Sequence, residues 1–106
     1  MVSEIMAAAG IKERGSRFLK PPAETYAVWS DDITAEAPDL APARVFTHDV
    51  TVELYEYKKD EAAVNALEAE LTNRGLEWTK QDRAWIQSEQ MYQTVYEFTY
   101  TEKRRA

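Results

Sequence analysis

The sequence contains no cysteine, which excludes disulfide bonds, zinc–thiolate sites and cysteine nucleophiles and fits a reducing compartment. Its three glycines stand alone at positions 10, 15 and 75, so no glycine-rich phosphate loop is present. No apolar run approaches the roughly 20 residues needed to span a bilayer, so no membrane partner is expected. Residues 1–6 lack the basic and apolar regions of a signal peptide. The protein is therefore expected to stay in a cytoplasm.

Basic residues are in the minority, with 13 Lys and Arg against 19 Asp and Glu and a formal net charge of -6. This balance argues against general binding to a phosphate backbone, which needs clustered Lys and Arg. The segment 102–105 is locally basic, and it is predicted to be a solvated, frayed terminus. Nucleic acid is therefore not expected as a tightly held ligand.

The 106 residues fit a single domain spanning residues 1–106, and 44% hydrophobic residues suffice for one core. Apolar residues at helical spacing predict helices over 3–9 and 60–73. Gly10 is a natural stop for the first helix. Asp60 is a good N-cap for the second.

Four strands are predicted, over residues 26–29, 45–57, 77–87 and 91–101. The second alternates most clearly, with one apolar face and one polar face. Its apolar face carries His48, Val50, Val52 and Leu54, and its polar face carries Thr47, Asp49, Thr51 and Glu53.

The predicted fold class is α+β, in the order α-β-β-α-β-β, with a four-stranded and mostly antiparallel sheet. A right-handed crossover through the second helix favours the sheet order 1-2-4-3, which is antiparallel throughout. Both helices would cover one face and leave the other polar. Residues 30–44, rich in Ala, Pro and acid, are interpreted as a long loop or an extended hairpin tip, either functional or a plain surface loop.

The search for reactive groups gives no catalytic, cofactor-binding or metal site. His48 is the only histidine, and catalysis would require an orienting partner and a nucleophile within reach. It is predicted to be a core-edge residue with a hydrogen-bond partner. Asp31, Asp32 and Glu36 could bind a hard cation, but their spacing matches no calcium loop. The protein is expected not to be an enzyme.

Aromatic residues are abundant, with six Tyr and three Trp. Most can fill a core while their polar tips reach water. Tyr55 and Tyr57 share the polar parity of their strand, and one of Tyr26 and Trp29 is expected to be exposed, since they have opposite parity. Exposed aromatics either form protein interfaces or stack single-stranded nucleic acid beside a basic groove. The acidic balance favours a protein interface.

Two segments carry a family resemblance. The segment 48–60, HDVTVELYEYKKD, resembles the V-x-I-E-L-Y-T-x-x-K-D strand-to-helix junction of small tailed-phage and prophage proteins. The segment 85–98, WIQSEQMYQTVYEF, resembles their W-I-x-S-E-x-x-Y-Q-x-x-Y-E hairpin. The proteins with these motifs are similar to tail terminator or head–tail joining proteins. The chain departs from their pattern at residues 30–44, where the family has a short polar stretch with Asn or Gly.

The resemblance implies a structural protein that assembles with itself as a ring, commonly a hexamer, at the head-proximal end of the tail. Its partners would be the tail tube and head–tail connector proteins, with DNA only passing through the lumen. It would occupy the bacterial host cytoplasm during assembly and then the virion. A small prophage-encoded binding or regulatory module, acting as monomer or dimer, is the alternative. The residues proposed for the interface or lumen are Trp29, Asp49, Thr51, Glu53, Tyr55, Tyr57 and Glu97.

Overall fold

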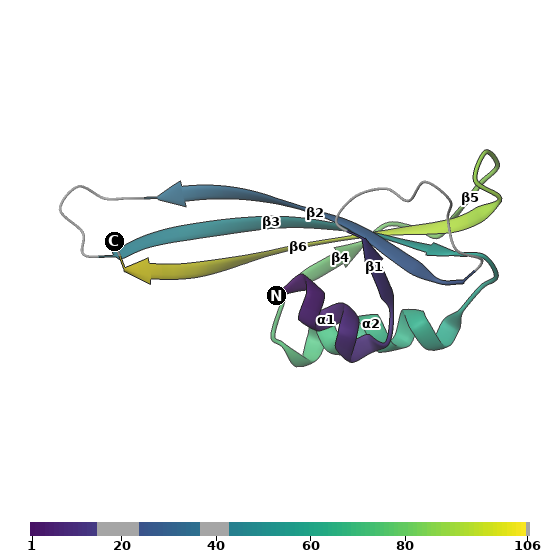
Figure 1. The fold of residues 1–106 in the computed structure, drawn as a ribbon, viewed down its shortest axis with the longest axis horizontal. Helices are drawn as coiled ribbons and strands as arrows, with labels where there is room; N and C mark the ends of the chain where they lie inside the picture. Colours follow the sequence, from purple (N-terminus) through teal and green to yellow (C-terminus); the bar gives the residue numbers. More distant parts are fainter. Residues whose placement is uncertain (15–23, 37–42, 106) are drawn as a thin grey trace.

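A computed structural model describes residues 1–14, 24–36 and 43–105 of the chain. The described residues form two helices and six strands (Figure 1). In chain order these are α1 (Val2–Ala9), β1 (Lys12–Arg14), β2 (Tyr26–Glu36), β3 (Ala43–Glu56), α2 (Glu61–Asn73), β4 (Trp78–Lys80), β5 (Ala84–Ile86) and β6 (Met91–Arg105). The α+β class is confirmed, and both helices lie within one residue of their predicted bounds.

The helix ends follow the predicted local chemistry. Asp60 is the N-cap of α2, and its side chain accepts a hydrogen bond from the Ala63 N–H at 3.0 Å. Gly10 ends α1 in the left-handed conformation at φ 72°, which glycine adopts without steric cost. These two residues therefore determine where α2 starts and where α1 stops.

The strands form a mixed sheet in the order β1-β2-β3-β6-β4, with β5 also paired to β6. Its centre, β2-β3-β6-β4, is antiparallel and reproduces the predicted order. The predicted number of four strands is wrong, because the described residues contain six. The sheet is mostly antiparallel, as predicted, and the predicted strands are all antiparallel to their neighbours, but the additional strand β1 pairs with β2 in parallel.

Short strands account for both differences. β1 has only three residues, too few to show an alternating pattern in the sequence. The single strand predicted over 77–87 is two three-residue strands, β4 and β5, on either side of residues 81–83. In that break, Arg83 binds the buried carboxylate of Glu56 at the end of β3. The break between β4 and β5 therefore places the Arg83 guanidinium beside the buried Glu56 carboxylate.

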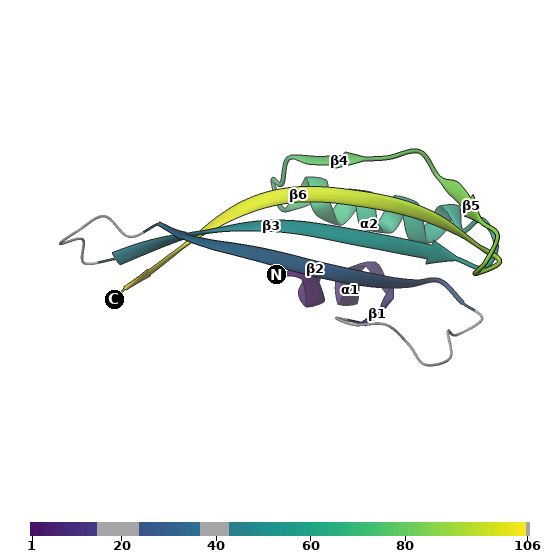
Figure 2. The same ribbon diagram turned by 90° about the horizontal axis from the view of Figure 1, so that it is seen from above.

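Both helices cover one face of the sheet, as Figures 1 and 2 show from two directions. Val50, Val52 and Leu54 are at most 1% exposed on that face, which confirms the predicted period of two in β3. The helices contribute apolar residues to the same core. The core cluster contains Val2, Ile5, Met6, Ile11, Ala27, Val50, Val52, Leu54, Val64, Leu67, Leu71, Tyr96 and Phe98.

The three longest strands extend past the helices and give the molecule its elongated shape, with extents of 52 × 29 × 22 Å (Figures 1 and 2). We call residues 32–36, 43–49 and 99–105 the arm, because β2, β3 and β6 pair there without a further strand among the described residues. Residues 30–36 and 43–44, predicted as part of a loop or hairpin tip, belong to paired strands, which supports the extended hairpin. Residues 37–42 lie outside the described residues.

The C-terminal segment 102–105 also corrects a prediction. Its composition predicts a frayed terminus, but β6 continues through Arg105 and pairs with β3 as far as Ala43. The reason is the length of β3, whose backbone continues to pair with β6 beyond the last apolar residue of β6. The basic end of the chain is therefore part of the arm.

Candidate assembly surface

The sheet face opposite the helices, called the open face below, brings together most of the residues proposed from the sequence. Thr51 pairs with Glu97, and Asp49 pairs with Thr99 in the same register. Because side chains alternate along a strand, Glu53 and Tyr55 project from this face as well. Asp49, Glu97 and Thr99 are exposed, and the other three are partly exposed.

A shallow hollow of about 320 Å³ lies over the middle of the open face. Four carboxylates line it, from Asp32, Asp49, Glu77 and Glu97. The Thr99 hydroxyl donates a hydrogen bond to Asp49 at 2.9 Å. The described residues contain no group of three or more His, Cys, Asp or Glu placed to hold a metal ion. The hollow is thus an acidic surface.

An aromatic cluster occupies the end of the open face away from the arm. The rings of Tyr26 and Tyr55 stack with their centroids 5.2 Å apart. Gln93 donates to the Tyr55 hydroxyl at 2.9 Å and to Glu53 at 3.3 Å. The pKa of Tyr26 is raised, mainly by burial and to a smaller extent by the nearby Tyr55. Its hydroxyl is therefore protonated at neutral pH. The cluster fixes the conformation of Tyr55 within the sheet.

Two of the proposed residues lie elsewhere. Trp29 projects from the helix-covered face and packs against the core, and its indole N–H is buried without a hydrogen-bond partner in the described part of the chain. Of the pair Tyr26 and Trp29, Tyr26 is 4% exposed and Trp29 is partly buried, so neither is the freely exposed aromatic expected from parity. Tyr57 is 52% exposed, beyond the end of β3.

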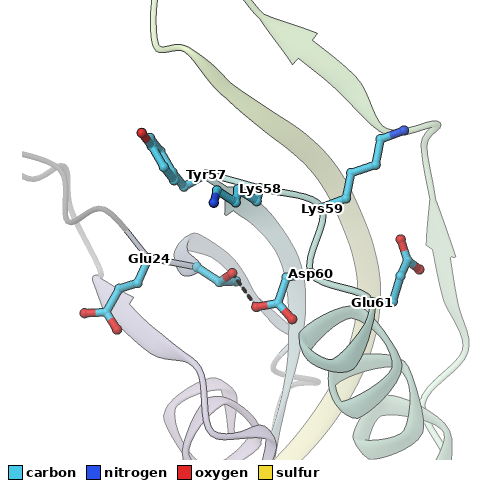
Figure 3. Close-up of a pocket in the computed structure, with 7 residues that line it drawn as sticks. Glu24, Tyr57, Lys58, Lys59, Asp60 and Glu61 are labelled. Carbon is cyan, nitrogen blue, oxygen red and sulfur yellow. Dashed lines mark hydrogen bonds between the residues drawn. The ribbon is translucent and has the colours of Figure 1, made fainter.

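Tyr57 lines a pocket of about 480 Å³ at the start of α2 (Figure 3). Lys58 and Lys59 line it beside acidic residues, so its charges are mixed. Thr25 donates to Asp60 at 2.7 Å, and this hydrogen bond, followed by that from the Ala63 N–H, lowers the pKa of Asp60. The Asp60 carboxylate at the helix start is therefore already paired within the protein.

His48 lies in the arm and is 4% exposed, as expected for a core-edge residue with a partner. Its Nδ1 is 2.8 Å from Asp31 Oδ2, and its Nε2 is 2.9 Å from Glu102 Oε1. The ring stacks on Tyr100 at 4.3 Å between centroids. Two carboxylate partners require both ring nitrogens to carry hydrogen, which is the charged imidazolium.

This cluster joins β2, β3 and β6 through one side chain. The hydrogen bond to Asp31 is the largest cause of a raised pKa for His48, and burial opposes it before the bond to Glu102 adds to it. Sequence reasoning missed Asp31 and Glu102 as partners, since their register depends on how far the strands continue. The one signal in the sequence was that His48 shares the parity of the buried residues of β3, which indicated a buried side chain in need of a hydrogen-bond partner.

No family model and no curated protein matches the sequence. Among solved structures, seven chains match. One of them belongs to a structure described as the virion of a native gene transfer agent (GTA) particle. The alignment has a TM-score of 0.58 and 14% identity, and it covers 90% of this chain and 81% of that chain. The likeness at this identity is one of fold, and it spans most of both chains.

Proposed function

We propose that this protein is a structural component of a phage-type virion, of the tail terminator or head–tail joining type. It would assemble as a ring at the head-proximal end of the tail and contact the tail tube and head–tail connector proteins. The fold shared with a chain of a gene transfer agent virion supports this proposal. The proposed role includes no catalytic step, and His48 acts in it as a brace between strands.

The observation that carries the proposal is the arm. Among the described residues it is three strands wide, and it extends beyond the helices (Figure 2). Both of its sheet edges carry backbone groups that can pair with another chain, which proteins usually avoid or cover. An exposed arm of this kind suits a subunit that completes its contacts in an assembly.

The open face suits the wall of a channel for DNA. Its carboxylates, including Asp49, Glu53 and Glu97, repel phosphates and so disfavour retention of the passing duplex. The hydroxyls of Thr47, Thr51 and Thr99 keep the surface hydrated.

Deleting the gene from the phage or prophage that encodes it tests the proposed role directly. If the protein terminates the tail, its loss is expected to give tails of abnormal length beside separate heads. Loss of a joining protein is expected to give heads and tails of normal length that remain separate. Electron microscopy of the lysate distinguishes these outcomes, and a plasmid copy of the gene serves as control. Normal particles from the deletion strain would refute the virion role.

Reversing the charge of the open face tests the channel. The double variant Asp49→Lys and Glu53→Lys is expected to fold, because neither carboxylate is buried, but to reduce the phage yield by at least about tenfold through impaired assembly or DNA passage. Circular dichroism checks the fold and plaque counts check the yield. The matched control is Glu70→Lys with Asp82→Lys, two positions on the side of the sheet that carries the helices. An unchanged yield in the open-face variant would rule out the channel wall.

A further inference from the structure

The two outer edges of the arm are long, and no further strand lies against them among the described residues. β1 covers β2 only at residues 26–28, and β4 covers β6 only at residues 96–98. Within the described ranges, no strand therefore pairs with the outer side of β2 over residues 29–36 or of β6 over residues 99–105. Each edge offers a row of backbone N–H and C=O groups to another strand.

The two edges carry opposite charges. Residues 29–36 contain three acidic residues, Asp31, Asp32 and Glu36, and no Lys or Arg. Residues 99–105 contain Lys103, Arg104 and Arg105 against one acid, Glu102. Asp31 and Glu102 bind His48 within the same molecule, so the remaining charges are acidic on β2 and basic on β6. Like edges of two copies repel each other, whereas unlike edges attract.

We propose that the β6 edge of one copy pairs with the β2 edge of the next copy and continues the sheet from subunit to subunit. This interface deepens the proposed function and rests on it for the closure of the ring. The contact joins two different surfaces, and such head-to-tail contacts generate either rings or open filaments. The partner is thus a second copy of this chain rather than an unrelated protein.

The strand directions determine the geometry of this contact. β2 and β6 are each antiparallel to β3, so they run in the same direction. A sheet continued from β6 to the β2 of the next copy therefore gains a parallel pair. It keeps every open face on one side and every helix layer on the other. Curvature toward the open face places the acidic surface inside and the helices outside.

The number of strands relates this interface to a channel. Barrels of about 8 strands are filled by side chains, whereas about 16–18 strands leave an aqueous channel. Three strands from each of about six copies reach that range. With a strand spacing of about 4.8 Å and a tilt of about 40°, the backbone diameter is roughly 36 Å. Rings of two or three copies would leave no passage for a duplex.

Disulfide cross-linking tests the pairing, because the natural chain contains no cysteine. Thr34 of β2 and Thr101 of β6 are both exposed on the arm, and within one copy each pairs with Thr47 of β3. Two strand spacings, about 10 Å, separate them there, which is beyond the roughly 7 Å limit for a disulfide. A bond between the two positions must therefore join two copies.

The expected result is specific to unlike edges. A mixture of purified Thr34→Cys and Thr101→Cys proteins should form disulfide dimers on oxidation, whereas each protein alone should stay monomeric. A chain with both substitutions should give a ladder of products. Thr99→Cys and Lys103→Cys, tested against Thr34→Cys in the same way, locate the register. Equal dimer formation by Thr34→Cys alone, or no cross-link at any β6 position, would overturn the proposal.

Charge variants test the attraction between the edges. Lys103→Glu, added to the Thr101→Cys protein, is expected to reduce the cross-linking rate by roughly two- to fivefold. Glu36→Lys in the Thr34→Cys partner should restore the rate by reversing the pair, because position 36 lies opposite position 103 when the parallel pair aligns Thr34 with Thr101. Lys58→Glu, an exposed position away from the arm, is the matched control and should leave the rate unchanged. Equal rates for Lys103→Glu and Lys58→Glu would remove charge as the basis of the pairing.

Failure of this interface and failure of the proposed function give different results. If no cross-link forms but the deletion strain makes defective particles, the interface is wrong and the virion role stands. If the ladder forms but purified particles lack the protein, the interface stands and the virion role is wrong.

Discussion

Replacing Arg83 with alanine is expected to lower the free energy of unfolding by about 3–5 kcal/mol, the range for breaking a buried ion pair on one side. Arg83 donates from Nε to Glu56 Oε1 at 3.1 Å and from Nη2 to Glu56 Oε2 at 2.9 Å. The Glu56 side chain is completely buried, so removal of the guanidinium leaves a buried carboxylate without its cation. The Asp60 N–H, at 2.6 Å from Oε2, remains as a partner but carries no full charge.

Urea unfolding of matched variants separates this effect from general damage. Glu61→Gln removes the second, exposed partner of Arg83 and is expected to cost less than about 1 kcal/mol. The double variant Glu56→Gln with Arg83→Met is expected to be more stable than Arg83→Ala alone, because it leaves no buried charge. A loss below about 1 kcal/mol for Arg83→Ala would show that water replaces the guanidinium at Glu56.

The ion pair between Glu56 and Arg83 could be predicted from the sequence only in part. Glu56 has the same parity in β3 as Val50, Val52 and Leu54, so alternation already placed a carboxylate on the buried face. The partner of that carboxylate could not be predicted, because Arg83 follows 27 residues later within a segment interpreted as one strand. A charged residue at a buried position was the available signal for a distant cation.

Local signals predicted the fold well where they are strong. The cap at Asp60, the stop at Gly10 and the alternation in β3 each depend on neighbouring residues, and each is confirmed. The arm depends instead on pairing between distant strands. Polar residues 30–36 resemble a loop when read alone, and they become a strand because β3 offers them a continuous backbone partner.

The candidate surface divides in the same way. Asp49, Thr51, Glu53 and Tyr55 share a face because parity within one strand requires it, and Glu97 joins them through the register with β6. The position of Trp29 depends on a different strand, β2, and the structure packs it against the core. The position of Tyr57 depends on where β3 ends, and the structure places it beyond that end, away from the open face. Their role at an interface, and that of the open face as a channel, stay predictions.

The second large effect is expected at His48, whose replacement by glutamine should lower stability by about 2–3 kcal/mol at pH 6. Glutamine can donate from its amide nitrogen only, so it cannot satisfy carboxylates on both sides as the imidazolium does. Asp31 and Glu102 then keep their charges without the cation between them. Asn65→Gln, an exposed helix position, is the matched control and should change stability by less than about 0.5 kcal/mol.

The effect of His48 should depend on pH in a definite direction. Its pKa is raised in the folded protein, chiefly by the hydrogen bond to Asp31, so the folded state holds the proton more tightly than the unfolded state. The stabilisation is fully present below the unfolded pKa of about 6.5 and is lost as pH rises through the folded pKa. The difference in urea stability between wild type and His48→Gln should therefore shrink at alkaline pH.

The single histidine allows a direct measurement of this pKa by NMR, because only one imidazole resonance titrates. The midpoint is expected above about 6.5 in wild type and lower in Asp31→Asn, which removes the largest cause of the raised pKa. A midpoint below about 6.5 in wild type, or a stability difference that does not change with pH, would contradict the charged brace.

Because one protonated side chain ties together β2, β3 and β6, the loss of that proton should also increase hydrogen exchange in residues 32–36 and 99–105 before it affects the core. Those residues form the edges proposed to pair between copies. Thiol oxidation itself speeds up as pH rises. The disulfide yield of the Thr34→Cys and Thr101→Cys mixture is therefore expected to fall in this pH range relative to the same mixture in a His48→Gln background.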